Sequence, residues 1–483
     1  MAILAIGKAV FQFLIGLKSF GTLSKGSLAH SAKNAFIVAS CVIATIGANE
    51  RASADDNLKT IFVEPSCAEH LYDKPIPTFS GATATGKARD SYCTESDYSD
   101  TSVSQSPTFV ELSKFVNDKR FDHFIAYYFI FSEPDVVDII CSRNKAAPIT
   151  MDLTVQQSSF EETDSAEPRG ISPTDSNIQR LQQCMGNALK VRWVGCAWFA
   201  PNAKCPRSEI ATMHLKFWKF QGTGLSDVVY VFGSGNIGQS LYANFDNWAF
   251  YSTNAGSAVD RQLGCLTDPI AQTDPVTENG VTDAYFRCLK AKNVYSADYP
   301  VSSFLMPATH LNFLLSTLTK KLAPFDDIYL TTQDIGGKQI HDFLVGLANQ
   351  GKRINIVLDD DFHWARYGIS VGVARATKAK WVEGLVHDGG GRITVRYLET
   401  NHHSSFKPSL HDKLLAATNS RNESFAVVST ANWDDGSLRS NLETVHLVNA
   451  SSWASFYLVE LERLWAKSFA DDELPIVDVA PKG

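Results

Sequence analysis

The chain has no excess of positive charge and no cysteine spacing typical of a zinc site. Its 44 Lys and Arg are outnumbered by 52 Asp and Glu, which gives a net charge of -8. The molecule as a whole therefore exerts no general attraction on polyanions, although a local basic cleft is compatible with this total. No two of the nine cysteines form a C-x-x-C pair, so the usual sequence sign of a structural zinc site is missing.

Acidic residues are absent before Glu50, and hydrophobic runs long enough to cross a bilayer are absent from the same region. Residues 1–54 contain scattered lysines and two apolar runs, at 2–16 and 35–44, and they end in Ala52-Ser53-Ala54. This layout is typical of a secretory signal peptide, and we predict that 1–54 is one. The alternative is an uncleaved membrane anchor, for which both apolar runs are short. We expect the protein to be secreted or otherwise extracytoplasmic.

Cysteine is also absent from the last part of the chain. If Cys41 is removed with the signal peptide, eight cysteines remain, all between residues 67 and 288. An even number in an exported protein predicts disulfides, whose pairing the sequence does not fix. Asn422 and Asn449 lie in N-x-S sequons that a eukaryotic secretory pathway would glycosylate, and we expect Asn422 to lie on an exposed loop.

The order of predicted elements occurs twice along the chain. In both copies a strand is followed by a helix, two more strands and a His-x-Lys triplet, beginning at residues 121 and 325. With 483 residues, the chain exceeds the usual size of one domain. We therefore predict an α/β protein with two similar lobes, at 108–300 and 301–483. Residues 55–107, rich in Ser, Thr and Asp, are predicted to form an irregular lead-in segment.

A pair of similar motifs lies within this repeat. In each motif His-x-Lys is followed by a hydroxyl residue, an asparagine and an acid at similar distances. The candidate catalytic residues are His214, Lys216, Asn236, His411, Lys413 and Asn432, and the candidate supporting residues are Ser234, Asp246, Thr430 and Glu443. A single His-x-Lys arises by chance in many chains, but two copies in matching context favour a catalytic site.

These residue types suit the chemistry of a phosphodiester. On a strand, the histidine and lysine of each triplet would point to the same face. Ammonium, hydroxyl and amide groups could then hold the phosphate oxygens without a metal or another cofactor. One histidine could attack phosphorus while the other protonates the leaving oxygen. Asp246 and Glu443 are candidates to fix the tautomer of an imidazole.

The paired motifs resemble those of the phospholipase D superfamily, whose pattern is His-x-Lys-x4-Asp followed by Gly-Ser-x-Asn and Ser-x3-Asn-x-Glu. The motif aspartate is absent, since Gln221 and Thr418 occupy its positions. In this the chain is more similar to the tyrosyl-DNA phosphodiesterase branch. The resemblance implies two lobes packed about a pseudo-twofold axis with the active site at their seam. It also implies His214 as nucleophile and His411 as general acid.

Three functions follow from this resemblance. The first is an exported, metal-independent phosphodiesterase of the phospholipase D type that hydrolyses phospholipids through a phosphohistidine and contacts a membrane surface. The second is a secreted nuclease acting on DNA or RNA, and the third is a relative that has lost activity. The acidic total charge and the aromatic residues near the motifs favour the phospholipid, and the presence of both histidines, lysines and asparagines disfavours loss of activity.

For several other residues the sequence is compatible with two different roles. Trp218, Trp248 and Trp433 could shape a substrate channel or pack in the core. The acids at 359–361 could bind a metal, but we expect a strand that ends in solvated acids. His402 and His403 could line the cleft or lie on a solvated loop, and residues 453–469 predict an amphipathic packing helix.

Overall fold

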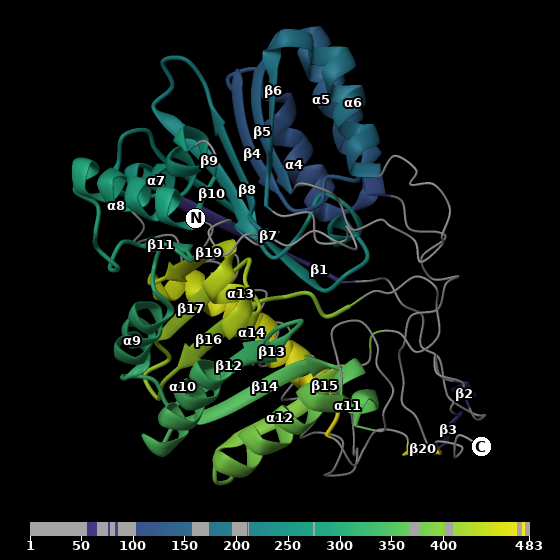
Figure 1. Ribbon diagram of the computed structural model, residues 1–483, viewed down its shortest axis with the longest axis vertical. Coiled ribbons are helices and arrows are strands. Elements are labelled where there is room, and N and C mark those ends of the chain that lie inside the picture. The colour runs from purple at the N-terminus through teal and green to yellow at the C-terminus, as the bar shows by residue number, and fades with distance from the viewer. Residues whose placement is uncertain are drawn as a thin grey trace, which may run out of the picture. The chain divides into compact units, whose positions relative to one another are not determined.

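The computed structural model describes most of the chain that follows the predicted signal peptide (Figure 1). The described residues are 56–64, 76–77, 83–85, 103–156, 173–195, 210, 212–273, 276–366, 376–398, 400, 409–470 and 476–478. The described residues all belong to one compact unit, Asp55–Gly483. The predicted signal peptide, His402, His403 and four of the predicted disulfide cysteines lie outside them.

Two sheets with the same strand order form the framework of this unit. The first consists, in spatial order, of β1 (Asn57–Val63), β10 (Asp246–Asn254), β9 (Asp227–Gly233), β8 (Lys216–Gln221), β4 (His123–Tyr128), β5 (Thr150–Gln156) and β6 (Leu189–Val194). The second consists of β11 (Val301–Met306), β19 (Asn441–Val448), β17 (Ser424–Ser429), β16 (Leu414–Thr418), β12 (Asp327–Thr331), β14 (Arg353–Asp359) and β15 (Ile393–Leu398), with β7 (Thr212–Met213) paired to β19.

The two sheets also agree in strand direction. In the first, the neighbours β1, β10, β9, β8 and β4 pair antiparallel in that order, and β4, β5 and β6 pair parallel. The second repeats this, with β12, β14 and β15 as the parallel strands. The predicted α/β class with two similar lobes is therefore confirmed. The lobe boundaries at residues 108 and 301 stay predictions.

The predicted irregular segment at 55–107 differs from the structure at its beginning. Residues 57–63 form β1, the edge strand of the first sheet, in register with β10 from Asn57 opposite Ser252 to Val63 opposite Asp246. Only Leu58 and Val63 of this strand are buried. Because its own apolar pattern is weak, the partner strand decides its conformation, and the sequence pattern alone did not reveal it.

Helices cover the outer face of each sheet (Figure 1). Those of the first lobe are α4 (Pro107–Asn117), α5 (Pro134–Ala146) and α6 (Pro173–Met185), and those of the second are α9 (Leu311–Leu322), α10 (Lys338–Asn349), α11 (Asp361–Ala365), α12 (Ala376–Asp388) and α13 (Asp435–Ser440). A central core holds α7 (Ala258–Gln272), α8 (Glu278–Lys292) and α14 (Ser451–Lys467), the last matching the predicted packing helix. The short strands are β2 (Ile76–Pro77), β3 (Thr83–Thr85), β13 (Ile335–Gly336), β18 (Trp433–Asp434) and β20 (Ile476–Asp478), and the 3-10 turns are η2 (Val103–Gln105), η3 (Gly186–Ala188) and η4 (Gln239–Leu241).

The central core joins the two lobes. It contains Phe217 and Tyr230 from the first sheet, Leu414 and Val428 from the second, and Tyr457 from α14, all buried. Strands covered on both faces read as nearly continuous apolar runs, as in β9 and β17, where almost every residue is buried. The inner ends of these strands are therefore held rigidly, and the motif residues lie there.

Among the described residues, disulfides link neighbouring helices at two places. Cys141 in α5 is bonded to Cys184 in α6, and Cys265 in α7 to Cys288 in α8. Such bonds are typical of an oxidising compartment. Within the described ranges, no helix is both long and apolar enough to span a membrane.

Candidate active site

Each histidine of the paired motifs is attached to the opposite lobe. The backbone N–H of His214 donates to the carbonyl of Leu442 in β19, and that of His411 donates to Phe245 just before β10, both at 2.9 Å. Parallel pairing of β7 with β19, and of Leu410 with Phe245, precedes these bonds. The two motifs therefore cross at the seam between the lobes.

The crossing corrects the expectation that His-x-Lys lies on one strand. His214 follows the end of β7 and Lys216 begins β8, while His411 and Lys413 both precede β16. The physical reason is that each histidine backbone pairs with the other lobe, whereas the strand that follows pairs within its own sheet. The chain must turn from one partner to the other between these pairings.

The side chains repeat this crossed arrangement. His214 Nδ1 lies 2.9 Å from both carboxylate oxygens of Glu443, and His411 Nδ1 lies 2.7 Å from Oδ1 of Asp246. Both carboxylates are fully buried. Because an ionised carboxylate only accepts hydrogen bonds, Nδ1 carries the hydrogen in each ring. The Nε2 atom of each ring is thereby left for a substrate.

The hydroxyl residues of the motifs bind these acids. Ser234 donates to Asp246 at 2.6 Å, and Thr430 donates to Glu443 at 2.7 Å. Both are fully buried, so they do not lie where a phosphate could reach them. The expectation that the hydroxyl groups hold phosphate oxygens is therefore wrong, because these donors are taken up by the buried carboxylates.

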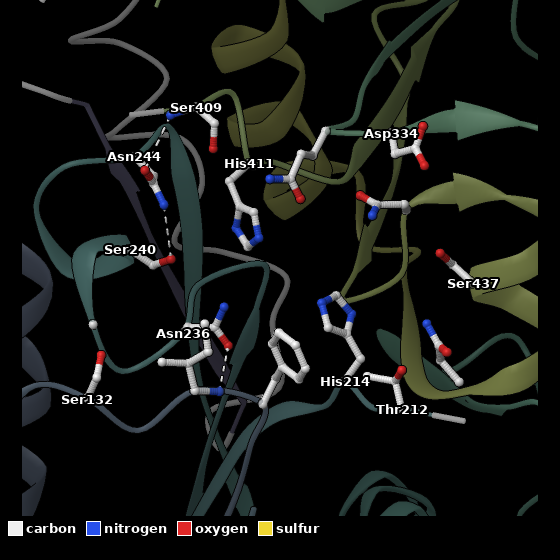
Figure 2. A pocket seen from close by; sticks show the side chains of 16 residues that line it. Ser132, Thr212, His214, Asn236, Ser240, Asn244, Asp334, Ser409, His411 and Ser437 are labelled. Atoms are coloured by element: carbon white, nitrogen blue, oxygen red, sulfur yellow. Dashed lines mark hydrogen bonds between the residues drawn. The ribbon is translucent and has the colours of Figure 1, made fainter. Parts of the chain in front are cut away.

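A cavity of about 590 Å³ lies between the two histidines. His214 and His411 line it together with both motif asparagines, Asn236 and Asn432, and Figure 2 shows the imidazoles pointing into the same space from opposite sides. Asn236 accepts a hydrogen bond from the N–H of Ile130 at 3.3 Å through its carbonyl oxygen. Its amide N–H groups are thus oriented as donors for a ligand.

The two lysines are buried behind the histidines. Lys216 Nζ donates to the carbonyl of His214 at 2.9 Å, and Lys413 Nζ donates to that of His411. Neither lies among the described residues that line the cavity. Burial lowers the pKa of Lys413 to about 8 and holds that of Lys216 well below its usual range. A nearby anion would favour the charged form of both ammonium groups.

Burial also controls the two imidazoles. It lowers the pKa of His214 and of His411 to about 4, although Glu443 and Asp246 act in the opposite direction. Burial acts to raise the pKa of Asp246, but His411 and Lys413 outweigh it, and the carboxyl keeps a pKa below its ordinary value. Both imidazoles are therefore neutral near pH 7 in the absence of a bound anion.

The walls of the cavity differ between the lobes, which the motifs did not predict. Phe129 and Ile130 follow β4 on the first-lobe side, and Gln333 and Asp334 occupy the corresponding place after β12. Phe129 contacts the His214 ring edge-on at a centroid distance of 4.9 Å. The signal in the sequence was the repeat itself, since aligning its two starts, Phe121 and Phe325, brings these pairs to equivalent positions.

Burial decides between the alternatives given above for the three tryptophans and for the acids at 359–361. Trp218, Trp248 and Trp433 are at most 4% exposed and lie in the cores of their lobes, so they pack rather than line a channel. The prediction of solvated acids at 359–361 is wrong, because Asp359 and Asp360 are buried. Asp359 accepts from the N–H of Leu410 at 2.8 Å, next to His411, and these bonds replace solvent.

Part of the chain matches a known protein family. Residues 321–465 match the family described as cardiolipin synthase, PLD-like domain. No curated protein matches the chain in sequence. Polyphosphate kinase from Porphyromonas gingivalis, a solved structure, is 10% identical with a TM-score of 0.46, and the match covers 78% of this chain and 49% of that one. The chain thus spans about half the length of that kinase.

Two further solved structures are similar over most of their length. Phosphatidylserine synthase from Haemophilus influenzae is 11% identical, with 76% of this chain and 84% of that one covered and a TM-score of 0.46. Yeast tyrosyl-DNA phosphodiesterase is 10% identical, with 71% and 85% covered and a TM-score of 0.42. The matched family domain contains the whole second motif, from His411 to Glu443. Residues 321–465 therefore form a PLD-like domain, the domain of the phospholipase D superfamily.

Proposed function

We propose that the protein is an exported, metal-independent phosphodiesterase of the phospholipase D type that hydrolyses phospholipids through a phosphohistidine. The observation that carries the proposal is the crossed pair of imidazoles at one cavity, each held through Nδ1 by a buried carboxylate of the other lobe. This arrangement leaves a nucleophile and a proton donor on opposite sides of a bound phosphate.

In the first step, neutral His214 attacks phosphorus through the lone pair of Nε2. A phosphorus–nitrogen bond forms, the bond to the leaving alcohol oxygen breaks, and protonated His411 gives its Nε2 hydrogen to that oxygen. Glu443 stabilises the positive charge that develops on His214, since it lies 2.9 Å from Nδ1. The alcohol leaves neutral, and the remaining phosphoryl group stays on His214.

In the second step, His411 is neutral and accepts a proton from water. The water oxygen attacks phosphorus, the phosphorus–nitrogen bond breaks, and His214 returns to its neutral form. The amide groups of Asn236 and Asn432 supply donors to the phosphate oxygens, and Lys216 and Lys413 supply positive charge from behind. An alcohol in place of water would give transfer instead of hydrolysis.

The lining of the cavity supports a polar substituent on the phosphate. Apart from Phe129 and Ile130, most of the lining side chains are hydroxyl, amide, imidazole or carboxylate groups. A phospholipid headgroup and its phosphate fit such a site, with the acyl chains left outside at a membrane surface. Asp334 lines the second-lobe side, where its carboxylate is paired with Lys378 at 2.9 Å. The two disulfides support export into an oxidising compartment.

The second candidate is a secreted nuclease that uses the same two steps on DNA or RNA. The observation that favours it is the number of amide and hydroxyl groups around the cavity, which suit sugar hydroxyls and base edges as well as a headgroup. The net charge of -8 disfavours it, because it gives no long-range attraction to a polyanion.

The test uses the full-length chain produced in a host with a secretory pathway, with excess EDTA. Phosphatidylcholine vesicles and single-stranded DNA are offered in parallel. We expect lipid turnover that falls about 100-fold or more in His214→Ala and in His411→Ala. His387→Ala is the matched control, because this side chain is 88% exposed and should leave activity unchanged. Turnover of DNA alone would establish the nuclease, and silence on both substrates would overturn the proposal.

A further inference from the structure

The two carboxylates of the site are held in different ways. Glu443 uses both oxygens, since Oε1 accepts from Asn441 at 3.2 Å and Oε2 accepts from Thr430 at 2.7 Å, and both lie near His214. Asp246 binds Ser234 and His411 through Oδ1 alone. Its Oδ2 is buried and has no hydrogen-bond partner among the described residues. The orientation of Asp246 therefore depends strongly on Ser234.

The asparagine that supports Glu443 has a counterpart in the first motif, but the counterpart does not contact the acid. Asn244 occupies the position equivalent to Asn441, but it donates to Ser240 at 3.4 Å and accepts from the N–H of Ser409 at 3.3 Å. Asp246 is also one methylene shorter than Glu443, so it reaches less far toward a partner. The half of the site that holds His411 thus needs another support.

That support is a chain of buried hydrogen bonds that crosses the seam. Asn247 donates to Oδ1 of Asp412 at 2.8 Å and to Oγ of Ser234 at 3.0 Å through its amide nitrogen, and its backbone N–H also donates to Ser234 at 3.1 Å. Asp412, Asn247, Ser234 and Asp246 are each at most 1% exposed. In the first motif the position of Asp412 is taken by Leu215, which cannot form such a bond.

We propose that Asp412 is a positioning residue of the proposed phosphodiesterase site, which fixes Ser234 through Asn247, orients Asp246, and so holds His411 as the imidazole that carries the proton. A buried carboxylate is costly unless it is hydrogen-bonded, so its place inside the motif requires a compensating contact of this kind. The proposal rests on the proposed function only for its kinetic consequence.

The charged and polar groups that face Asp412 determine its behaviour with pH. They are Asp246 in β10, Lys413 beside it, Glu460 in α14, and the uncharged Asn247 and Ser234. Burial and the charge of Asp246 raise the pKa of Asp412 to about 7, and Lys413 opposes them. Below neutral pH the residue therefore acts as a neutral hydrogen-bonding group, which an asparagine can imitate.

The experiment compares Asp412→Leu with Asp412→Asn. The leucine copies the first motif and breaks the chain, and we expect kcat to fall about 10- to 100-fold with little change in KM, because the phosphate-binding amides are untouched. The asparagine retains an oxygen for Asn247 and should restore most of kcat at pH 5. Wild-type kcat in the leucine variant would overturn the proposal.

A nitrogen NMR titration of the histidine rings gives a readout that does not depend on turnover. In Asp412→Leu we expect His411 to lose its single tautomer, while His214, held by Glu443, keeps its own and serves as the internal control. If the leucine variant does not fold, Asn247→Ala interrupts the same chain and should reproduce the result. An unchanged His411 ring in a folded variant would overturn the proposal. A wild-type protein that cleaves no phosphodiester would refute the proposed function alone.

Discussion

Each imidazole of the proposed site combines a buried ring with one carboxylate partner, and the balance between burial and that partner sets the pKa of the ring. Burial is the stronger influence, since the pKa of both His214 and His411 falls to about 4 despite Glu443 and Asp246. An anionic phosphate in the cavity would offset part of this cost by favouring the imidazolium. A bound phosphate or an acidic medium would therefore favour the protonated form of these imidazoles.

The pH dependence of turnover follows from these values. Nucleophilic His214 must be neutral, so activity rises as pH increases through about 4, whereas the acid His411 must be protonated, so activity falls above its own pKa of about 4. We expect kcat/KM to peak in the acidic range and kcat to decline at a higher pH, because kcat reports the substrate complex. Rate profiles from pH 3 to 9 check this. A kcat/KM that increases steadily from pH 5 to 8 would contradict it.

The two sequons should behave differently in a secretory host. Asn422 is exposed, with a positive φ of 59°, in the turn between β16 and β17. The amide nitrogen of Asn449 donates to the carbonyls of Ala297 and Tyr299, at 3.0 and 2.7 Å. We expect a glycan at Asn422 and none at Asn449 in the folded protein. Peptide mass spectrometry decides this, with Asn422→Gln as the control that removes the glycan.

Residue types alone indicated the histidines, but not what each side chain contacts. The motif spacing correctly predicted that His214, Asn236, His411 and Asn432 share one cavity. These residues lie near strand ends that the core holds in place. The spacing could not show that Ser234 serves a carboxylate, since a hydroxyl can bind either a ligand or a buried acid. The contact between Asn247 and Asp412 joins residues of different lobes and leaves no periodic signal.

At the level of elements, two pairs of helices are covalently linked by disulfides in addition to packing against the sheets. The bond between Cys265 and Cys288 joins α7 to α8 across 23 residues, next to the central core. A cross-link of this span limits the freedom of the unfolded chain and typically contributes about 2–4 kcal/mol. Elements that contribute to the central core also set the distance between the lobes, so their stability bears on the site.

Replacing both cysteines of this pair by alanine should lower the free energy of unfolding by about 3 kcal/mol. Denaturant titration of the double variant Cys265→Ala, Cys288→Ala measures the loss. The corresponding alanine pair at Cys141 and Cys184 is the comparison, since that bond joins α5 to α6 on the outside of the first sheet. Unchanged stability in both double variants would show that the disulfides do not stabilise the fold.

The strand patterns anticipated most elements but not their partners. Alternation and apolar runs predicted β4, β5, β12 and β14, because these strands pack between covered faces. They did not reveal β1, whose conformation depends on β10. Nor did they indicate that β7 leaves its own sheet to pair with β19, since a two-residue strand has no pattern of its own.

For the molecule as a whole, the crossing of the two motifs is the decisive feature. The acid of each copy serves the histidine of the other, so the functional pairs are His214 with Glu443 and His411 with Asp246. Duplication was visible in the sequence through the repeated element order. The exchange of partners was not, because sequence spacing is the same whether each acid serves its own copy or the other.

The crossing can be tested by neutralising one acid at a time. Glu443→Gln should lower the pKa of His214 further, because the anion that favours the imidazolium is lost, and should change His411 much less. Asp246→Asn should give the mirror result. NMR titration of both histidine rings in both variants measures these changes. A Glu443→Gln variant whose main change is at His411 would contradict the crossed assignment.

Because the acids are exchanged across the seam, the histidine of each half depends on residues of the other half. His214 depends on Glu443, Thr430 and Leu442, all from the second lobe, and His411 depends on Asp246 and Phe245 from the first. Neither lobe could work as an autonomous catalyst if it were severed and folded alone. We therefore expect a substitution of an acid in one half to impair the histidine of the other half.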